Sequence, residues 1–236
     1  MREIVLSGPG KNALSSDLMG RTLDAVRAAD EEPILLIGEG DAFSAGLDLR
    51  EVATLDGAAM TRFLDLLDAL CRAIFEHTGP TVACVNGHAI AGGCVLAMAC
   101  DYRVATTNGK ARIGLNETAI GLAFPPLVTR LVRARMPRGS EREVLLGAGL
   151  FEPSEALRLG LLDELAHDPR AAALAKLEAL SAHPRAAYRI NKHQLTGGVL
   201  DVTPDEQASF RQYMLPLWTG PDLKARLRAH LDKRKG

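Results

Sequence analysis

Apolar residues along the chain alternate between short continuous runs and longer stretches in which they recur every three or four positions. The stretches 17–29 and 60–74 show this helical spacing, and the run GGCVLAMAC (92–100) also suits a helix. The short runs have the length and composition of buried strands: REIVL (2–6), PILLIGEG (33–40), TVACVNG (81–87) and YRVAT (102–106). This alternation predicts an α/β fold with parallel strands and covering helices.

The pattern changes beyond about Asp163. From Pro169 onward the chain contains helical segments, such as 171–183 and 222–235, and no convincing strand. We therefore expect an α/β core over residues 1–163 and a C-terminal helical region over residues 164–236. The Leu- and Ala-rich faces of these helices suit docking on the core or on another subunit.

Composition narrows the function classes. The chain has 236 residues, of which 47% are hydrophobic, so it can build one large core. A net charge of −1 gives no electrostatic footprint for nucleic acid or an anionic membrane. No apolar run reaches the roughly 18 residues of a membrane span, and the sequence enters a strand-like run at once. We expect a cytoplasmic protein whose four cysteines are reduced and buried.

The stretch VNGHAIAGGCVLAMACDYR (85–103) places a glycine pair between a strand-like run and a helix-like run. It lacks the G-x-x-x-x-G-K-[ST] and G-x-G-x-x-G patterns of phosphate-binding loops. His88, Cys94 and Cys100 lack the spacing of metal ligands, so we expect no metal site. The remaining interpretation is a helix N-terminus whose exposed N–H groups stabilise developing negative charge.

Two further stretches carry candidate chemistry. In GDAFSAGLDLREV (40–52), small residues surround Gly46 and leave room for a group to approach the backbone, although Asp48 also fits an ordinary capped turn. In ARIGLNETAIGLAFPP (111–126), Glu117 is a lone carboxylate with mostly apolar neighbours. An apolar site would raise its pKa toward the range of a general base. A turn or capping carboxylate is the alternative.

Five stretches in order resemble the crotonase superfamily, the enoyl-CoA hydratase/isomerase family. They are GPGKNALSSDLM (8–19), AFSAGLDL (42–49), the glycine-pair stretch 85–103, IGLNETAIGL (113–122) and FEPSEALRLGLLDEL (151–165). The resemblance implies a spiral of ββα units followed by C-terminal helices that build homotrimers or dimers of trimers. It also implies an acyl-CoA thioester substrate in fatty acid metabolism. Coenzyme A is then part of the substrate, and no separate cofactor is expected.

The resemblance assigns roles to individual residues. Leu47 and Gly92 correspond to the positions whose N–H groups form the family's oxyanion hole, and Glu117 corresponds to its second catalytic glutamate. Residues around the oxyanion positions are expected to contact the substrate: Ala45, Gly46, Leu49, Gly93, Val95 and Phe124. Arg50 is a candidate for the coenzyme A phosphates, because Asp41 stands where many relatives carry a lysine.

One departure from the family pattern bears on the reaction. Hydratases of the family hold the added water between two glutamates, and the first of these positions is Val95 in this chain. Valine neither orients nor deprotonates water, whereas one base is enough to move a double bond from C3–C4 to C2–C3. The chain therefore favours Δ3,Δ2-enoyl-CoA isomerisation with Glu117 as the single acid/base. The alternatives are hydration, decarboxylation or thioester hydrolysis, and a non-catalytic acyl-CoA-binding scaffold.

Overall fold

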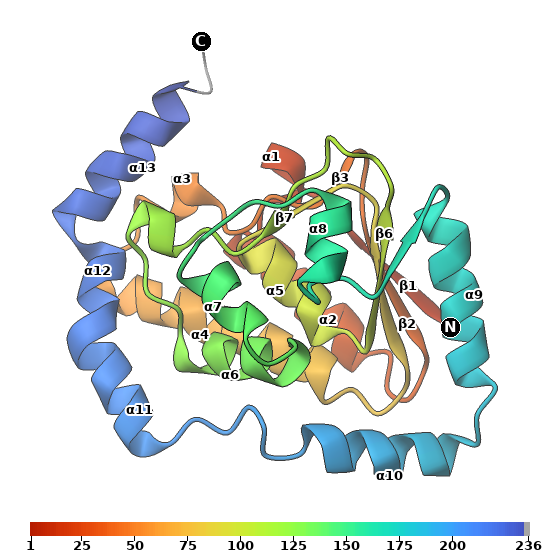
Figure 1. The fold of residues 1–236 in the computed structure, drawn as a ribbon. Helices are drawn as coiled ribbons and strands as arrows, with labels where there is room; N and C mark the ends of the chain where they lie inside the picture. Colours follow the sequence, from red (N-terminus) through yellow and green to blue (C-terminus); the bar gives the residue numbers. More distant parts are fainter. Residues whose placement is uncertain (234–236) are drawn as a thin grey trace.

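Two parallel sheets form the centre of the molecule (Figure 1). The computed structural model describes the backbone of residues 1–233 and the side chains of residues 1–227. The larger sheet has the strand order β1-β2-β4-β6-β8, with β1 (Arg2–Leu6), β2 (Ile34–Gly38), β4 (Thr81–Val85), β6 (Tyr102–Thr106) and β8 (Glu164–Ala166). The smaller sheet has the order β3-β5-β7, with β3 (Ala42–Ser44), β5 (His88–Ile90) and β7 (Ile113–Gly114).

Successive strands go alternately to the two sheets. Strands β2, β4 and β6 enter the larger sheet, and the strand that follows each one, β3, β5 or β7, enters the smaller sheet. Helices follow after each of these pairs, so the chain winds forward by one ββα unit at a time. This arrangement confirms the α/β class and the ββα spiral expected from the sequence.

The helices pack around both sheets. Those of the spiral are α1 (Pro9–Asn12), α2 (Ser16–Arg27), α3 (Leu49–Val52), α4 (Gly57–Phe75), α5 (Gly92–Ala99), the short 3₁₀ helix η1 (Thr118–Ile120), α6 (Pro126–Arg135), α7 (Ser140–Leu145) and α8 (Pro153–Arg158). Every residue of α5 is buried, which explains why its sequence is apolar on all sides. It packs against α4, α6 and the smaller sheet, and it forms the middle of the core.

The predicted helices and strands of the core are confirmed, with differences only at their ends. The helix predicted over 17–29 begins at Ser16 because the Ser15 hydroxyl accepts a hydrogen bond from the Leu18 N–H, at 3.1 Å. The helix predicted over 60–74 begins at Gly57 because the Asp56 carboxylate caps the Ala59 N–H, at 2.7 Å. Both ends are therefore set by capping side chains, just outside the apolar pattern.

The C-terminal region divides into a part on the sheet and a part that extends from it. Strand β8 pairs with β6, and α9 (Pro169–Ser181) covers β2, β4 and β6. The remaining elements are α10 (Arg185–Thr196), α11 (Pro204–Ser209), the π-helical turn η2 (Phe210–Met214), α12 (Leu215–Thr219) and α13 (Pro221–Lys233). Figure 1 shows them as a chain of helices around the edge of the core.

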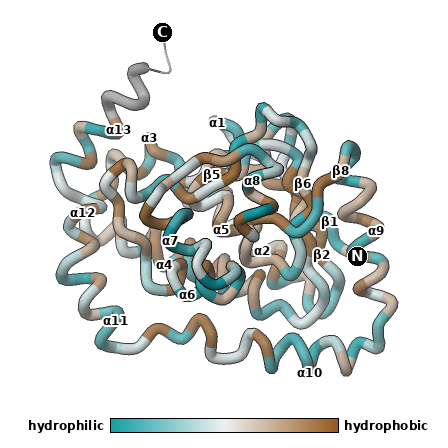
Figure 2. The backbone as a smooth tube through the Cα atoms, in the orientation of Figure 1, coloured by the Kyte–Doolittle hydropathy of each residue, from teal (hydrophilic) through white to brown (hydrophobic). Residues whose placement is uncertain are grey.

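Helix α10 makes little contact with the rest of the chain. Its buried residues are Lys192 and Thr196. The Lys192 ammonium donates to the Asp101 carboxylate at 2.7 Å and to the Gly79 carbonyl at 3.0 Å, which fixes the helix to the end of the core. The hydrophobic side chains of Ile190 and Leu195 are exposed, and Figure 2 shows both hydrophobic and hydrophilic residues along this helix.

Candidate active site

The three predicted catalytic residues each follow a strand of the smaller sheet. Leu47 lies three residues after the end of β3, Gly92 two residues after β5, and Glu117 three residues after β7. These strands are parallel neighbours in the order β3-β5-β7, so their carboxyl ends lie at one edge. Residues far apart in the sequence are thus brought together where open α/β sheets commonly bind ligands.

The loop that carries Leu47 is held by backbone hydrogen bonds to Leu14. The Leu14 N–H donates to the Gly46 carbonyl at 2.8 Å, and the Asp48 N–H donates to the Leu14 carbonyl at 3.0 Å. Gly46 has a φ of +87°, a left-handed conformation that favours glycine. Among the described residues, the Leu47 N–H between these two anchors has no hydrogen-bond acceptor. It is free to donate to a ligand.

A strained residue sets the direction of the second N–H group. Ala91 has a φ of +51°, which is unusual for a residue with a side chain, and its own N–H donates to the Gly114 carbonyl at 2.8 Å. Helix α5 begins at the next residue, Gly92, whose N–H has no acceptor within the described part of the chain. A Cβ at Gly46 would lie 3.5 Å from the Gly92 nitrogen, so the two loops are in contact.

The second glycine of the pair has a packing role. A Cβ at Gly93 would lie 2.5 Å from the Ser44 carbonyl oxygen, so only glycine lets α5 approach β3 this closely. A Cβ at Gly92 would instead meet the ends of the Leu47 and Leu14 side chains, at 3.1 and 3.2 Å. Gly92 therefore lies beside the free N–H groups, and Gly93 allows α5 to pack closely against β3.

Glu117 is buried with one carboxylate oxygen unpaired. Its residue is 7% exposed, and its Oε2 atom has no hydrogen-bond partner among the described residues. Burial raises the pKa of its carboxyl from the ordinary 4.5 to about 7. Although Glu117 precedes η1, its side chain makes no capping hydrogen bond, so the capping alternative does not explain it.

Glu117 also lies close to the first turn of α5. Its charge is one of the causes, after burial, that raise the pKa of the Cys94 thiol. Cys94 lies two residues beyond Gly92 on that turn. The Glu117 carboxylate is therefore near the turn that carries the Gly92 N–H group.

The other predicted substrate contacts lie on the same loops. Val95 is buried on α5 at 1% exposure, one turn beyond Gly92. Ala45 and Leu49 flank the Leu47 loop and are half-buried. Phe124 lies in the segment between η1 and α6, where it packs against the core.

The residues that first suggest a metal site have structural surroundings. The His88 Nδ1 accepts a hydrogen bond from the Arg112 N–H at 3.2 Å, and burial lowers its pKa. Cys94 and Cys100 are buried thiols whose pKa values are raised to about 12. Within the described part of the chain, no group of three or more His, Cys, Asp or Glu side chains is placed to hold a metal ion.

The charged residues near the Leu47 loop lie at the surface. Asp41 forms an ion pair with Lys11 at 3.1 Å, which brings a lysine from another segment beside the position where many relatives carry one. Arg50 is exposed at the start of α3. Across residues 1–233, none of the helices is both long enough and apolar enough to span a bilayer.

Sequence reasoning missed the residues that support the Leu47 loop. Asn12 is buried, and its amide donates to the Glu39 and Ala42 carbonyls, both at 2.9 Å. The Ser44 hydroxyl donates to the Asn12 carbonyl at 2.8 Å. The stretch GPGKN (8–12) carried a signal in its small residues and its asparagine, but only the fold shows that it holds the Leu47 loop.

The C-terminal helices also reach the Glu117 segment. The Trp218 indole N–H donates to the Ala123 carbonyl at 3.0 Å, and the Arg226 guanidinium donates to the Ile120 carbonyl at 3.4 Å. Both contacts come from the same chain, so α12 and α13 cover the segment that holds the carboxylate. Nothing in the sequence pattern indicated these two residues.

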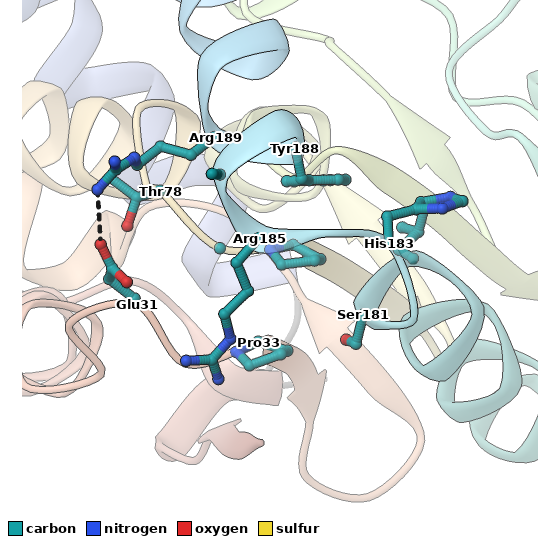
Figure 3. Close-up of a pocket in the computed structure, with 12 residues that line it drawn as sticks. Glu31, Pro33, Thr78, Ser181, His183, Arg185, Tyr188 and Arg189 are labelled. Atoms are coloured by element: carbon teal, nitrogen blue, oxygen red, sulfur yellow. Dashed lines mark hydrogen bonds and ion pairs between the residues drawn. The ribbon is translucent and has the colours of Figure 1, made fainter.

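The cavity drawn in Figure 3 belongs to a different part of the molecule. It lies where the α9–α10 connection meets the start of β2 and β4, and its lining includes Arg185, Tyr188 and the Glu31–Arg189 ion pair at 3.1 Å. None of its lining residues is a predicted site residue.

The edge of the smaller sheet therefore combines two elements of acid/base chemistry on a carbonyl compound. Two N–H groups without acceptors can stabilise an oxyanion, and a buried carboxylate with a pKa near neutrality can exchange a proton. Each element requires the folded chain, because the donors and the carboxylate come from three separate loops.

Comparisons with known proteins identify the family of the chain. The sequence matches the enoyl-CoA hydratase/isomerase family over residues 1–235. It is 30% identical over 199 residues to the mitochondrial enoyl-CoA delta isomerase 1 of Rattus norvegicus, covering 82% of this chain and 68% of the relative. It is 35% identical over 237 residues to a putative enoyl-CoA hydratase of Thermus thermophilus, covering 95% of this chain and 91% of the relative.

Solved structures show the same fold. The human mitochondrial delta3-delta2-enoyl-CoA isomerase aligns with a TM-score of 0.89 and 24% identity, over 99% of this chain and 94% of that chain. The enoyl-CoA hydratase of Bacillus halodurans aligns with a TM-score of 0.84 and 26% identity, over 96% and 95% of the two chains. On the match along its whole length, the chain belongs to the enoyl-CoA hydratase/isomerase family of the crotonase superfamily.

Proposed function

We propose that this enzyme is a Δ3,Δ2-enoyl-CoA isomerase that uses Glu117 as its single acid/base. The observation that carries the proposal is a buried carboxylate with an unpaired oxygen, combined with a valine where the hydratases of the family have their first glutamate. Val95 is buried at 1% exposure and offers no group that can hold a water molecule. The relative from Rattus norvegicus, named a delta isomerase, supports the same choice.

The reaction needs one proton carrier. The Glu117 carboxylate removes a proton from C2 of a 3-enoyl-CoA, and the electron pair of that C–H bond moves toward the thioester carbonyl. The resulting dienolate carries its negative charge on the thioester oxygen, between the N–H groups of Leu47 and Gly92. The Glu117 carboxylic acid then returns the proton to C4, the carbonyl re-forms, and the double bond lies at C2–C3.

The pKa of Glu117 suits both steps. Because the pKa of its carboxyl is about 7, the Glu117 carboxylate is a stronger base than an ordinary carboxylate. It is still partly ionised at neutral pH, and its acid form can return the proton. The chemistry requires no cofactor beyond the coenzyme A of the substrate, which we infer to be the partner molecule of this site.

Hydration is the second candidate, because relatives with similar identity are named hydratases. The crotonyl-CoA hydratase of Syntrophomonas wolfei is 33% identical over 162 residues, and the Thermus thermophilus relative is a putative hydratase. A direct comparison of 3-enoyl-CoA isomerisation with 2-enoyl-CoA hydration separates the two. Hydration faster than isomerisation would contradict the proposal.

We also infer that the enzyme assembles as a homotrimer or a dimer of trimers. Helix α10 extends from the core with Ile190 and Leu195 exposed, and a neighbouring subunit is a natural cover for such a face.

The replacement Glu117→Gln removes the base and keeps the shape of the side chain. We expect isomerisation of 3-enoyl-CoA to fall by about 10²–10⁴-fold, the usual contribution of general acid–base catalysis. Steady-state kinetics on purified protein measure this. A suitable control is Glu39→Gln, an exposed carboxylate outside the site. Isomerisation by Glu117→Gln at the parent rate would show that Glu117 is not the base.

The pH dependence of the reaction follows from the ionisation of the same carboxyl. Because the base must be ionised to remove the C2 proton, kcat/KM should fall about tenfold per pH unit below a pKa of about 7 and level off above it. Measuring kcat/KM for 3-enoyl-CoA across this range tests the assignment. A profile that stays flat down to pH 5 would place the ionisation near the ordinary carboxyl value instead.

The replacement Gly46→Ala tests the oxyanion loop. A Cβ at this position would lie 2.7 Å from the Ile90 carbonyl oxygen, so the loop must shift and carry the Leu47 N–H with it. We expect kcat to fall by about 10²-fold or more, as when one oxyanion donor is lost.

Gly40→Ala is the matched control for this variant. Gly40 also has a positive φ, +74°, but a Cβ there would have nothing within 4 Å. It therefore carries a similar conformational cost without touching the site. Equal losses of kcat in the two variants would show that general destabilisation, and not the position of the N–H group, explains the effect.

A further inference from the structure

A second carboxyl with an unpaired buried oxygen lies on a half-buried residue away from the edge of the smaller sheet. Asp68 is on α4, and its Oδ1 atom is buried without a hydrogen-bond partner among the described residues. Burial is the largest cause that raises the pKa of this carboxyl from the ordinary 3.8 to about 7, and the charge of Asp65 adds to it. Neither the proposed reaction nor the core packing explains an acidic side chain at this position.

Asp68 faces the junction between the core and the C-terminal helices. It lines a small cavity with residues of the α6 start and of α11, η2 and α12, including Pro125, Gln207, Phe210 and Leu215. Figure 1 shows α11 and α12 along the left edge of the molecule, where one end of α4 lies, and α12 packs against α4. We name the helices from α11 to α13, residues 204–233, the C-terminal arm.

The arm is irregular at the point where it passes Asp68. The turn η2 (Phe210–Met214) is a π-helix, a rare form that commonly marks functional positions in helices. Phe210, its first residue, is buried and lines the cavity with Asp68. The carboxyl therefore lies against the least regular part of the arm.

Among the charged groups around Asp68, Arg72 lowers the pKa of this carboxyl, but burial and Asp65 outweigh it. Arg72, one turn along α4, binds Glu76 and Asp201 at 2.6 and 3.1 Å. Asp65 on the same helix adds a like charge, and the buried Cys71 thiol is neutral because its own pKa is raised.

Within the described residues, the charged side chains on the elements that face Asp68 make no ion pair with it. On α6 and α11, Arg130 and Glu206 bind each other at 2.8 Å. Arg211 of η2 lines the cavity and is exposed to solvent. Ionisation of Asp68 would leave its buried Oδ1 without a donor, and movement of the arm away from α4 would allow water to hydrate that oxygen.

The downstream end of the same arm covers the proposed catalytic loop. Trp218 and Arg226 donate hydrogen bonds to Ala123 and Ile120, within a few residues of Glu117. The helical run from Pro204 to Thr219 connects the Asp68 cavity to Trp218, and Arg226 lies on α13 beyond a break at Gly220. A change in packing at Asp68 can therefore reach the cover of the site through α12.

We propose that Asp68 is a proton-sensitive latch: its neutral form holds the C-terminal arm against α4 and over the Glu117 loop, and its ionisation loosens the arm. The docking itself is independent of the reaction, and only its effect on turnover rests on the proposed function. In mildly acidic conditions the C-terminal arm is then docked over the Glu117 loop, and in alkaline conditions it is more often detached.

The direction follows from linkage between protonation and docking. Because docking raises the pKa of Asp68, its contribution to docking is complete below the ordinary value of 3.8. The contribution is lost progressively as the pH rises toward about 7, and docking is weakest and independent of this group above that value.

The fluorescence of Trp218 reports whether the C-terminal arm is docked on the core. It is the single tryptophan of the chain, it is 2% exposed, and it lies on α12. We expect the acrylamide quenching constant of its fluorescence to rise about twofold or more between pH 5.5 and 7.5 and then to level off. This measurement uses the full chain without substrate, so it is independent of whether the enzyme is an isomerase.

Three variants make the test specific. Asp68→Asn, a neutral mimic of the protonated acid, should keep quenching low at all pH values. Asp65→Asn removes the like charge and should move the rise to lower pH; it also serves if Asp68→Asn does not fold, as judged by circular dichroism. Glu117→Gln should leave the rise unchanged, which separates this titration from that of the catalytic carboxyl.

Two results would overturn the latch. One is quenching that does not depend on pH in the parent chain. The other is a rise that persists unchanged in both Asp68→Asn and Asp65→Asn, which would assign the transition to a different group. Failure of Glu117→Gln to affect isomerisation would contradict the proposed function and leave this result untouched.

Discussion

The close approach of two backbone loops at one edge of the smaller sheet is the constraint on which the site depends. Gly46 and Gly92 come so near that a Cβ on the first would press on the Ile90 carbonyl at 2.7 Å. This contact exists only because β3 and β5 are parallel neighbours and Ala91 accepts a φ of +51°. The strain is localised where two N–H groups must be left without acceptors, which is a common feature of functional sites.

The Glu117 carboxylate at the same edge is buried without an ion pair among the described residues, so its burial does not stabilise the fold. An isolated carboxyl loses hydration when it is buried, and here the cost appears as a raised pKa rather than as an ion pair. The fully buried helix α5 and the apolar core around it offset this cost. Glu117 and Asp68 are alike in this respect, although one faces the catalytic edge and the other faces the C-terminal arm.

The sequence predicted the main helices and the strands β1, β2, β4 and β6 because each has a run of apolar residues long enough to show a pattern. It missed β8, a strand of three residues inside the region 164–236 that was expected to be helical. The strands of the smaller sheet contain two or three residues, which is too short for any periodicity, and only the family resemblance implied them. Glu117, Leu47 and Gly92 were assigned through motif positions, and these assignments stay predictions. The roles of Asn12, Ala91 and Trp218 could not be predicted, since they depend on backbone conformation and on contacts across the chain.

The fate of one hydrogen atom tests the single-base mechanism most directly. A 3-enoyl-CoA that carries deuterium at C2 is converted by the enzyme, and the product is examined for deuterium at C4 by mass spectrometry. Because one buried carboxyl removes and returns the proton, we expect a substantial share of the label to reach C4 within the same molecule. A 2-enoyl product whose C4 gains hydrogen only from solvent, at every stage of conversion, would contradict a mechanism in which Glu117 alone carries the proton.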